Sequence, residues 1–426
     1  MDIRLDDPHF VLSSAQLGDE LTSQVIEAIR IRGACSQSDV VRLTGLGRTP
    51  VTERIRQVTA LGLFETKGTI SRMYGRPPRA LQLRPGAGHL LVASLGAASM
   101  DVAVADIGGS ILANEAEPSR IGDGPEAVLG RVDEIFEHLR TDCTSLSGPL
   151  LGVGVAVPGP VEFSTGRPVA PPIMPGWDNY PIRERFGARY GAPVWVDNDV
   201  NVMALGERRE GVARGHSNVV FVKVGTWIGA GVISDNTLHR GAQGAAGDVG
   251  HIQVVDDPTV VCRCGNVGCL EAIAGGFALG REAERVARAG GSEKLAAALN
   301  LNGALRASDV IFAATHGDAT SVELLQRSGR LVGSMLASVV NLLNPSLIVV
   351  GGGVAAAGDV FLAAVRERVY ARSLPLATRQ LLVAQSVLGD RAGTIGTAAM
   401  VLDELFSTPQ LSTTLRALGA RAPAPL

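Results

Sequence analysis

The N-terminal part of the chain begins with apolar residues at helical spacing. Between Leu21 and Arg32 they are Val25, Ile26, Ala28 and Ile29, and Gly33 follows. Because residues three and four positions apart share one face of a helix, and glycine commonly ends one, the pattern predicts an amphipathic helix over residues 21–32. Ser36 and Ser38 are candidate N-caps for a second, shorter helix containing Val40, Val41 and Leu43.

A third helix is predicted after the turn Gly45-Leu46-Gly47. We expect Thr49 to be its N-cap and Pro50 its first residue, where the missing N–H costs nothing. Its inward face consists of Val51, Ile55 and Val58, and its polar outer face consists of Thr49, Thr52, Glu53, Arg56 and Gln57. This arrangement is typical of a helix-turn-helix, whose last helix reads the major groove of DNA. The alternative is a small helical module that only packs.

A β-hairpin wing is predicted next, with strands at 63–66 and 69–72 and a turn at Lys67-Gly68. The segment Gly75-Arg76-Pro77-Pro78-Arg79 then has the thin, extended form that lets an arginine enter a minor groove. A surface linker stiffened by its prolines is the alternative. The candidate DNA-contacting residues are Arg48, Thr49, Thr52, Arg56, Gln57, Arg72 and Arg76.

The pattern changes after about His89 to short apolar runs separated by helical segments. The runs end in glycine or acidic turns, and a helix is predicted over Pro125–Leu139. The predicted strands are 90–96, 100–105, 111–115, 151–157, 194–196, 219–224 and 347–350. Buried strands that alternate with helices predict an α/β body whose sites lie at the strand ends.

Composition agrees with several packed units. The chain has 426 residues, of which 46% are hydrophobic and 19% charged, so one domain is too few and global disorder is excluded. No apolar run is long enough to span a bilayer, and the first residues lack the basic and apolar regions of a signal peptide. We therefore expect a cytoplasmic protein with no membrane contact.

Charge is unevenly distributed. Residues 21–80 contain ten Arg/Lys and four acidic residues, a local charge of +6, whereas the whole chain has a net charge of −3. The remainder is thus strongly acidic. A basic module on an acidic body is the expected charge pattern of a DNA-binding head.

Three of the five cysteines, Cys262, Cys264 and Cys269, fall within eight residues. In a cytosolic chain such a cluster indicates a metal site rather than a disulfide framework. A closed set of three thiolates and one imidazole suits a structural Zn²⁺ ion. The alternative is a set of reduced, unliganded side chains.

The same region carries the motif by which the chain resembles a known family. Gly250-His251 is followed by Cys262-Arg-Cys264-Gly265-Asn-Val-Gly268-Cys269-Leu-Glu271, and Asp197-Asn198-Asp199-Val200-Asn201 precedes them. These motifs resemble those of the ROK family (repressors, open reading frames and sugar kinases), in its transcriptional-regulator branch, and the resemblance covers residues 21–403.

The resemblance implies a winged helix-turn-helix followed by a two-lobed, actin-like and sugar-kinase-like body of the ribonuclease H-like type. We place the domains at 1–20 (tail), 21–84 (DNA-binding head), 85–205 (first lobe), 206–405 (second lobe with the zinc loop) and 406–426 (tail). It also implies that His251 is the fourth ligand of one structural Zn²⁺ per chain.

The resemblance further implies a sugar site. It assigns sugar contacts to Asn198, Asp199 and Glu271, with Asp248 and His251 beside them. Asp248 stands where the family usually has Glu, and Ile173 stands where it has Asn, which leaves the identity of the sugar open. The alternative for Asn198 and Asp199 is that they only cap helices and turns.

The phosphate-binding loops depart from the family's kinases. Ser94-Leu95-Gly96-Ala97-Ala98 replaces their Asp-x-Gly-Gly-Thr, and Trp227 stands where they usually have Gly. Asp106-Ile-Gly-Gly-Ser110 has similar letters but lies at the end of the next strand, where we expect a hairpin turn. Gly351-Gly352-Gly353 is retained. We expect no catalytic residues.

The sequence thus predicts a DNA-binding regulator, a repressor of carbohydrate genes, that binds operator DNA and a small sugar or sugar-phosphate effector. We expect a homodimer or homotetramer with paired heads. Two alternatives remain: an ATP-dependent sugar kinase carrying a DNA-binding head, and a constitutive DNA-binding protein with a purely structural body.

Overall fold

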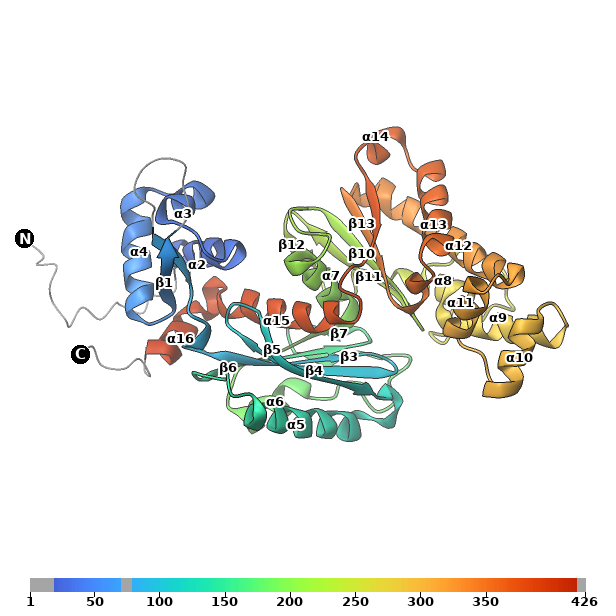
Figure 1. Ribbon diagram of the computed structural model, residues 1–426, viewed down its shortest axis with the longest axis horizontal. Coiled ribbons are helices and arrows are strands. Elements are labelled where there is room, and N and C mark those ends of the chain that lie inside the picture. The colour runs from blue at the N-terminus through green and yellow to red at the C-terminus, as the bar shows by residue number, and fades with distance from the viewer. Residues whose placement is uncertain (1–18, 70–78, 420–426) are drawn as a thin grey trace, which may run out of the picture.

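The computed structural model describes residues 19–69 and 79–419. A small N-terminal head lies at one end of a body that consists of two lobes (Figure 1). The predicted Arg72 and Arg76 lie outside the described residues.

The head contains the three predicted helices, α2 (Glu20–Arg32), α3 (Gln37–Thr44) and α4 (Arg48–Ala60). Asp19 caps α2, and Ser36, one of the two candidate N-caps, caps α3 in a capping box with Asp39. Gly45 ends α3 in the left-handed conformation, with φ of 68°. The apolar faces meet in one core, which includes Ile26, Ile29, Val40, Val51 and Val58.

Two details of α4 differ from the sequence prediction. Its N-cap is Gly47, and Thr49 and Pro50 follow within the first turn. Proline is tolerated there because first-turn N–H groups have no partner inside the helix. Gln57 is buried rather than outward-facing: its amide donates to Glu53 Oε1 at 2.6 Å and accepts from Arg54 Nη1 at 3.0 Å.

The wing also differs. Its strands are β1 (Phe64–Thr69) and β2 (Arg79–Leu83), which pair antiparallel with Phe64 opposite Leu83 and Thr69 opposite Arg79. The predicted turn at Lys67-Gly68 is wrong, because both residues lie within β1 where the register shifts. Gly68 has a φ of 62° there, as expected for a β-bulge.

The first lobe is built on the sheet β5-β4-β3-β6-β9. The strands are β3 (His89–Leu95), β4 (Ser99–Asp106), β5 (Ile111–Pro118), β6 (Leu150–Val157) and β9 (Val194–Asn198). Helices α5 (Pro125–Asp142) and α6 (Ile182–Tyr190) cover one face, where Phe136, Trp177 and Phe186 are fully buried. The opposite face packs against α7 (Asp199–Glu210) and α15 (Arg391–Leu405).

The second lobe repeats this topology in the sheet β12-β11-β10-β13-β14. Its strands are β10 (Val219–Val224), β11 (Ile228–Ser234), β12 (Thr237–His239), β13 (Leu347–Gly351) and β14 (Leu382–Gln385). The helices of this lobe are α8 (Leu270–Ala274), α9 (Gly276–Arg288), α10 (Glu293–Asn302), α11 (Ala307–Thr315), α12 (Ala319–Leu343), α13 (Asp359–Arg372) and α14 (Pro375–Thr378). Three antiparallel strands followed by two parallel ones in each lobe confirm the predicted two-lobed α/β body.

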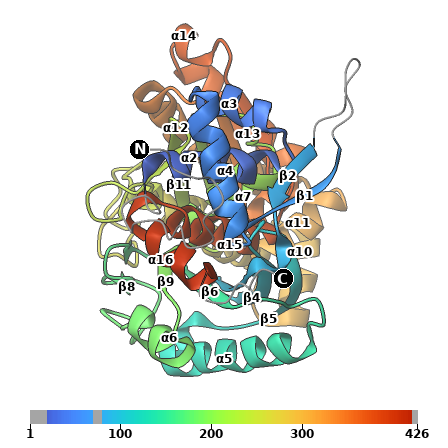
Figure 2. The same ribbon diagram turned by 90° about the vertical axis from the view of Figure 1, so that its left-hand side faces the viewer.

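The C-terminal part of the chain returns to the first lobe and the head. Helix α15, placed in the second lobe from the sequence, packs on β3 and β6 of the first sheet. Beyond it, residues of the predicted tail form α16 (Thr408–Gly419), whose Leu411, Leu415 and Leu418 are buried in the core that the head and first lobe share. Figure 2 shows α16 next to α15 beneath the head.

Short elements complete the described chain: β7 (Val161–Glu162), β8 (Arg167–Pro168) and the 3₁₀ turns η1 (Pro85–Ala87), η2 (Ile121–Asp123), η3 (Val249–His251) and η4 (Gly353–Ala357). Among the helices of residues 19–69 and 79–419, none is long and apolar enough to cross a membrane.

Candidate functional site

A cavity with a volume of about 770 Å³ lies between the two lobes. Strand ends and turns from both sheets form its wall. The contributing segments include the β3–β4 turn, the β9–α7 junction, the β10–β11 turn, residues between 244 and 251 with Glu271, and the glycine turn after β13. The five predicted sugar-site residues, Asn198, Asp199, Asp248, His251 and Glu271, all line this cavity.

Asn198 has a structural role as well as a place in the cavity wall. Its Oδ1 accepts from the N–H of Val200 at 2.9 Å and of Asn201 at 3.3 Å, so Asn198 is the N-cap of α7. Its Nδ2 donates to the carbonyl of Gly159 at 3.0 Å. The capping role considered from the sequence is therefore present, and it fixes the backbone from which Asp199 projects.

Asp199 forms an ion pair with Lys223, a residue that sequence reasoning missed. Lys223 Nζ lies 2.5 Å from Asp199 Oδ2, and the Asp199 side chain is only 7% exposed. The signal available in the sequence was a single lysine in the otherwise apolar strand Val219–Val224. A charged residue inside a buried strand requires a partner, because an unpaired buried charge is costly.

Glu271 and Asp248 present carboxylates in different settings. Glu271 is buried, accepts from the N–H of Ile228 at 3.3 Å, and has its pKa raised mainly by that burial. Asp248 is exposed at the cavity wall, and η3 follows it directly. A buried acceptor beside an exposed one suits a ligand that carries several hydroxyl groups.

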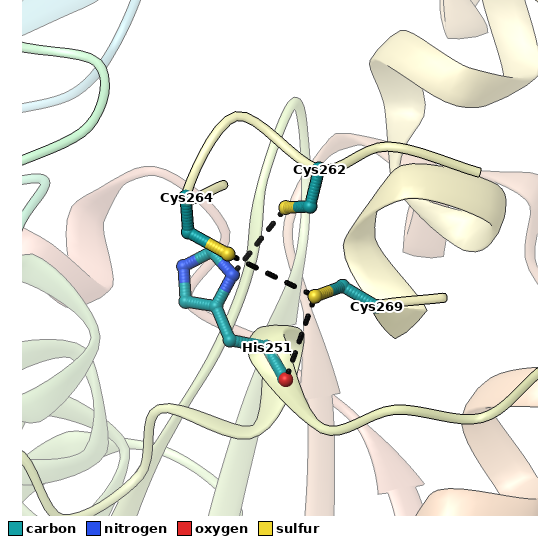
Figure 3. A group of neighbouring side chains, drawn as sticks. All are labelled: His251, Cys262, Cys264 and Cys269. Carbon is teal, nitrogen blue, oxygen red and sulfur yellow. Dashed lines mark hydrogen bonds between the residues drawn. The ribbon is translucent and has the colours of Figure 1, made fainter. Parts of the chain in front are cut away.

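The four predicted metal ligands converge at one point, where their ligand atoms all lie within 4.8 Å of one another (Figure 3). Cys264 Sγ lies 3.8 Å from Cys269 Sγ, and Cys262 Sγ lies 3.6 Å from His251 Nδ1. A tetrahedral ion with Zn–S bonds of ~2.3 Å and a Zn–N bond of ~2.0 Å requires about 3.8 Å and about 3.5 Å for these separations. The residues therefore fit a zinc ion.

Burial disfavours the charged thiolate form of two cysteines of the cluster. Burial, reinforced by Cys264 and Cys262, raises the pKa of the Cys269 thiol to about 12. Burial likewise raises the pKa of Cys262. Three thiolates cannot share this volume without a positive charge between them, so a bound cation is what would ionise them.

The loops compared with kinase loops lie where the sequence places them. Ser94 and Trp227 line the cavity, whereas Asp106 to Ser110 form the hairpin turn between β4 and β5, with Asp106 Oδ1 accepting from the Ser110 N–H at 2.9 Å. The Trp227 ring stacks on Phe277 at 6.3 Å between centroids. The Arg263 guanidinium, from the cysteine loop, lies 4.8 Å from the Trp227 centroid. The indole is therefore held in place at the cavity wall.

The outer surface of α4 carries four of the seven predicted DNA-contacting residues. Arg48, Thr49, Thr52 and Arg56 are exposed, and Arg56 pairs with Glu53 at 2.7 Å on the same surface. Gln57 is turned inward. The exposed polar set is what a recognition helix needs to meet base edges.

A sequence model of the ROK family matches residues 92–404, almost the entire two-lobed body. This chain belongs to the ROK family. The match begins after the head, so the family model does not cover the head.

Some relatives match nearly the whole chain, so their similarity includes the head. The chain is 29% identical over 388 residues to the xylose repressor of Caldicellulosiruptor bescii, which covers 91% of this chain and 96% of that protein. The body alone has too few residues for that alignment, so the similarity extends into the head. The crystal structure of a ROK family transcriptional regulator, a homolog of the E. coli MLC protein, matches 94% of this chain and 98% of that one, with a TM-score of 0.78 and 26% identity.

The ROK body is also similar to that of an enzyme. A ROK family glucokinase from Streptomyces griseus, solved with glucose and AMPPNP, has a TM-score of 0.64 and is 30% identical, covering 74% of this chain and 99% of the glucokinase. The body of this chain is thus shared by regulators and kinases, and the residues of its own cavity must decide between the two activities.

Proposed function

We propose that this ROK protein is a sugar-responsive transcriptional repressor: the head binds operator DNA, and a sugar bound between the lobes changes that binding. The observation that supports this most directly is one continuous packed structure, which joins an exposed recognition helix to a hydroxyl-binding cavity. The xylose repressor of C. bescii resembles the chain over both parts. Xylose is therefore the first sugar to test.

Two helices connect the cavity to the head. Helix α7 begins at Asp199 in the cavity and ends beside the head, where Arg209 donates to the carbonyl oxygens of Arg30 at 3.1 Å and Gly108 at 2.7 Å. Helix α15 begins near Gly393 at the cavity and ends near Asp403, an ion-pair partner of Arg30 in α2 (Figure 1). A movement of either helix at the cavity therefore reaches the head.

Arg30 is the centre of the contact between head and body. It is buried, pairs with Glu27 at 2.7 Å within α2, and also pairs with Asp403 of α15. Ser23 donates to the carbonyl of Phe406 at 2.7 Å beside it. These contacts join α2 to α15, so a shift of α15 would move the head.

The second lobe is tied to α7 as well. Glu207 of α7 is fully buried and accepts from the Ser386 hydroxyl at 2.5 Å and the Leu388 N–H at 3.2 Å, both in the segment after β14. Closure of the lobes around a ligand would thus act on the helix that also contacts the head. In a dimer or tetramer the same motion would change the spacing of two heads over two half-sites.

We infer that the chain has lost ATP-dependent phosphorylation. Ser94 replaces an acidic Mg²⁺ anchor, and the stacked Trp227 fills the second phosphate loop. Lys223 holds the Asp199 carboxylate in an ion pair, so Asp199 acts as a hydroxyl acceptor in a binding site rather than as a catalytic base.

The bound metal would be structural zinc. Three cysteine sulfurs and His251 Nδ1 leave no open position, and the ion would fold the loop that leads into α8, where Glu271 lies. With Nδ1 on the metal, the His251 proton stays on Nε2, which makes this nitrogen a donor for a ligand hydroxyl.

The proposal is tested by two measurements on the full chain. A thermal-shift screen of sugars and sugar phosphates should reveal an effector that raises the melting temperature. A coupled kinase assay with that effector and Mg-ATP should then show no turnover. Phosphorylation faster than about 1 per second would establish the kinase alternative instead.

A further inference from the structure

Lys223 lies in β10 between two strand positions that carry no side chain, and its own side chain lines the cavity. On the flanking strands it lies opposite Gly229 of β11 and Gly351 of β13. Side chains at paired positions of adjacent strands share one face, and both partners here have none. The lysine is 25% exposed, lines the cavity and reaches Asp199 across it.

The ion pair leaves hydrogen-bonding capacity on both partners. Lys223 Nζ has three donors, and within the described residues its contact to Asp199 Oδ2 uses one. The Asp199 carboxylate keeps lone pairs for a further donor. Because this charged donor and charged acceptor lie 2.5 Å apart, they can bind two neighbouring hydroxyl groups of a ligand. They can also bind one hydroxyl group together, which then accepts from Lys223 and donates to Asp199.

The charge of the cavity wall argues against a phosphorylated ligand. Among the described lining residues, Lys223 is the one lysine and there is no arginine. The carboxylates there are Asp101, Glu117, Asp199, Asp248, Glu271 and Asp390. Glu117 is paired with Arg131 outside the cavity, and Lys223 is already neutralised by Asp199. In the described part of the cavity wall no unpaired Arg or Lys is available to a phosphate, so a phosphate beside the Asp199–Lys223 pair would meet excess negative charge.

We propose that Lys223 is a specificity-determining ligand contact: together with Asp199 it recognises hydroxyl groups of an unphosphorylated, uncharged sugar. This rests on the proposed function and narrows the effector expected from the sequence, a sugar or a sugar phosphate, to the free sugar. Asp199 neutralises the positive charge of Lys223. The lysine therefore donates a hydrogen bond to the ligand but gives the pair no net attraction for an anion.

The test measures affinities of the full chain by calorimetry for unphosphorylated pentoses and hexoses and for their phosphates. The wild type should bind a free sugar at least tenfold more tightly than its phosphate. Lys223→Met keeps the length of the side chain and removes the charge. This variant should bind that sugar about ten- to a hundredfold more weakly than the wild type. Lys294→Met, at an exposed lysine of α10 outside the cavity, is the matched control and should bind like the wild type.

A second variant covers the possibility that an unpaired Asp199 unfolds the protein. Lys223→Met combined with Asp199→Asn removes both charges. The double variant should fold and should also bind the sugar more weakly. Its loss of binding free energy should be smaller than the sum of the losses of the two single variants, because the two residues act as a unit. Unchanged sugar affinity in Lys223→Met or in the double variant would overturn the proposal. So would a wild type that prefers a sugar phosphate.

Failure of the proposed function has a different signature. If the sugar binds and depends on Lys223 but does not alter operator affinity, the specificity contact stands and the regulatory role falls. If the sugar releases the operator equally well from the wild type and from Lys223→Met, the regulatory role stands and the specificity contact falls. If no free sugar binds the wild type, both fall.

Discussion

At the scale of single residues, the four candidate metal ligands are placed to fix the loop that leads into α8, where Glu271 lies. Cysteine and histidine are rare residues, three of the four ligands fall within eight positions, and the structure brings all four to within 4.8 Å. The sequence could not show which histidine nitrogen faces the cluster. The structure identifies it as Nδ1.

Removal of one thiol tests the metal site. Purified wild type should contain one zinc per chain, and Cys264→Ser should lose it, because a closed site needs all four ligands. The loop leading to Glu271 should then loosen, and sugar affinity should fall. Elemental analysis and calorimetry measure both effects. Cys143→Ser, which changes a cysteine outside the cluster, should keep the zinc. A folded, metal-free wild type would refute the assignment.

Asp199 is the residue whose substitution should separate sensing from DNA binding. Asp199→Asn keeps the shape of the side chain but weakens its ion pair with Lys223 and its ability to accept from a sugar hydroxyl. Sugar affinity should fall about tenfold to a hundredfold, equivalent to ~1–3 kcal/mol. Operator affinity without sugar should stay within about threefold of wild type.

The control for this variant is Asp235→Asn, at an exposed turn residue with a φ of 47° that asparagine also adopts readily. Calorimetry with the sugar and anisotropy with the operator give the two affinities. Equal sugar affinity in Asp199→Asn and Asp235→Asn would show that the ligand lies elsewhere.

At the scale of elements, α4 is the surface on which the DNA-binding proposal depends. Arg56 is exposed and its partner Glu53 lies on the same surface, so the ion pair contributes little to stability and leaves the guanidinium available to a base edge. Arg56→Ala should weaken operator binding by about 1–3 kcal/mol and relax the preference at particular base pairs.

A similar pair on the body provides the control for Arg56. Arg285 and Glu282 on α9 form the same i, i+3 exposed arrangement. Arg285→Ala should leave operator affinity unchanged at every salt concentration tested. Binding titrations against operators with single base changes distinguish a base contact from a phosphate contact. If Arg56→Ala and Arg285→Ala bind all operators alike, α4 is not the recognition helix.

Local sequence signals predicted most helices and strands, but not which strands pair or which distant side chains meet. The caps at Ser36 and Gly45 follow from short-range chemistry, so α3 was predictable. Lys67-Gly68 was not, because a glycine with positive φ serves a bulge within β1 as well as a hairpin turn, and only the pairing of Thr69 with Arg79 decides between them. Lys223 was missed since its meaning depends on Gly229, Gly351 and Asp199, which are distant in sequence.

At the scale of the whole molecule, the C-terminal helices were the hardest to predict. Helix α15 follows the second lobe in sequence yet packs on the first sheet, and α16 lies against α2 of the head. Such packing depends on contacts across most of the chain, which periodicity does not reveal. The consequence is functional, because α15 extends from the cavity to Arg30.

The contact between Arg30 and Asp403 should transmit the sugar signal. Asp403→Asn weakens this pair, so sugar should still bind with wild-type affinity while the ratio of operator affinities without and with sugar falls toward one. Couplings of this kind amount to ~1–3 kcal/mol. Asp142→Asn, at an exposed position at the end of α5 far from α2, is the control and should keep the full ratio. An undiminished ratio in Asp403→Asn would exclude this contact from the signal path.

The most direct test of the regulatory claim is the operator affinity of the full wild-type chain, measured by fluorescence anisotropy at one fixed salt concentration. The operator is first selected from random duplexes, and the sugar is the one found by thermal shift. Saturating sugar should weaken operator binding at least tenfold, with a midpoint that tracks the dissociation constant of the sugar. An operator affinity that does not change between no sugar and saturating sugar would contradict the regulatory claim.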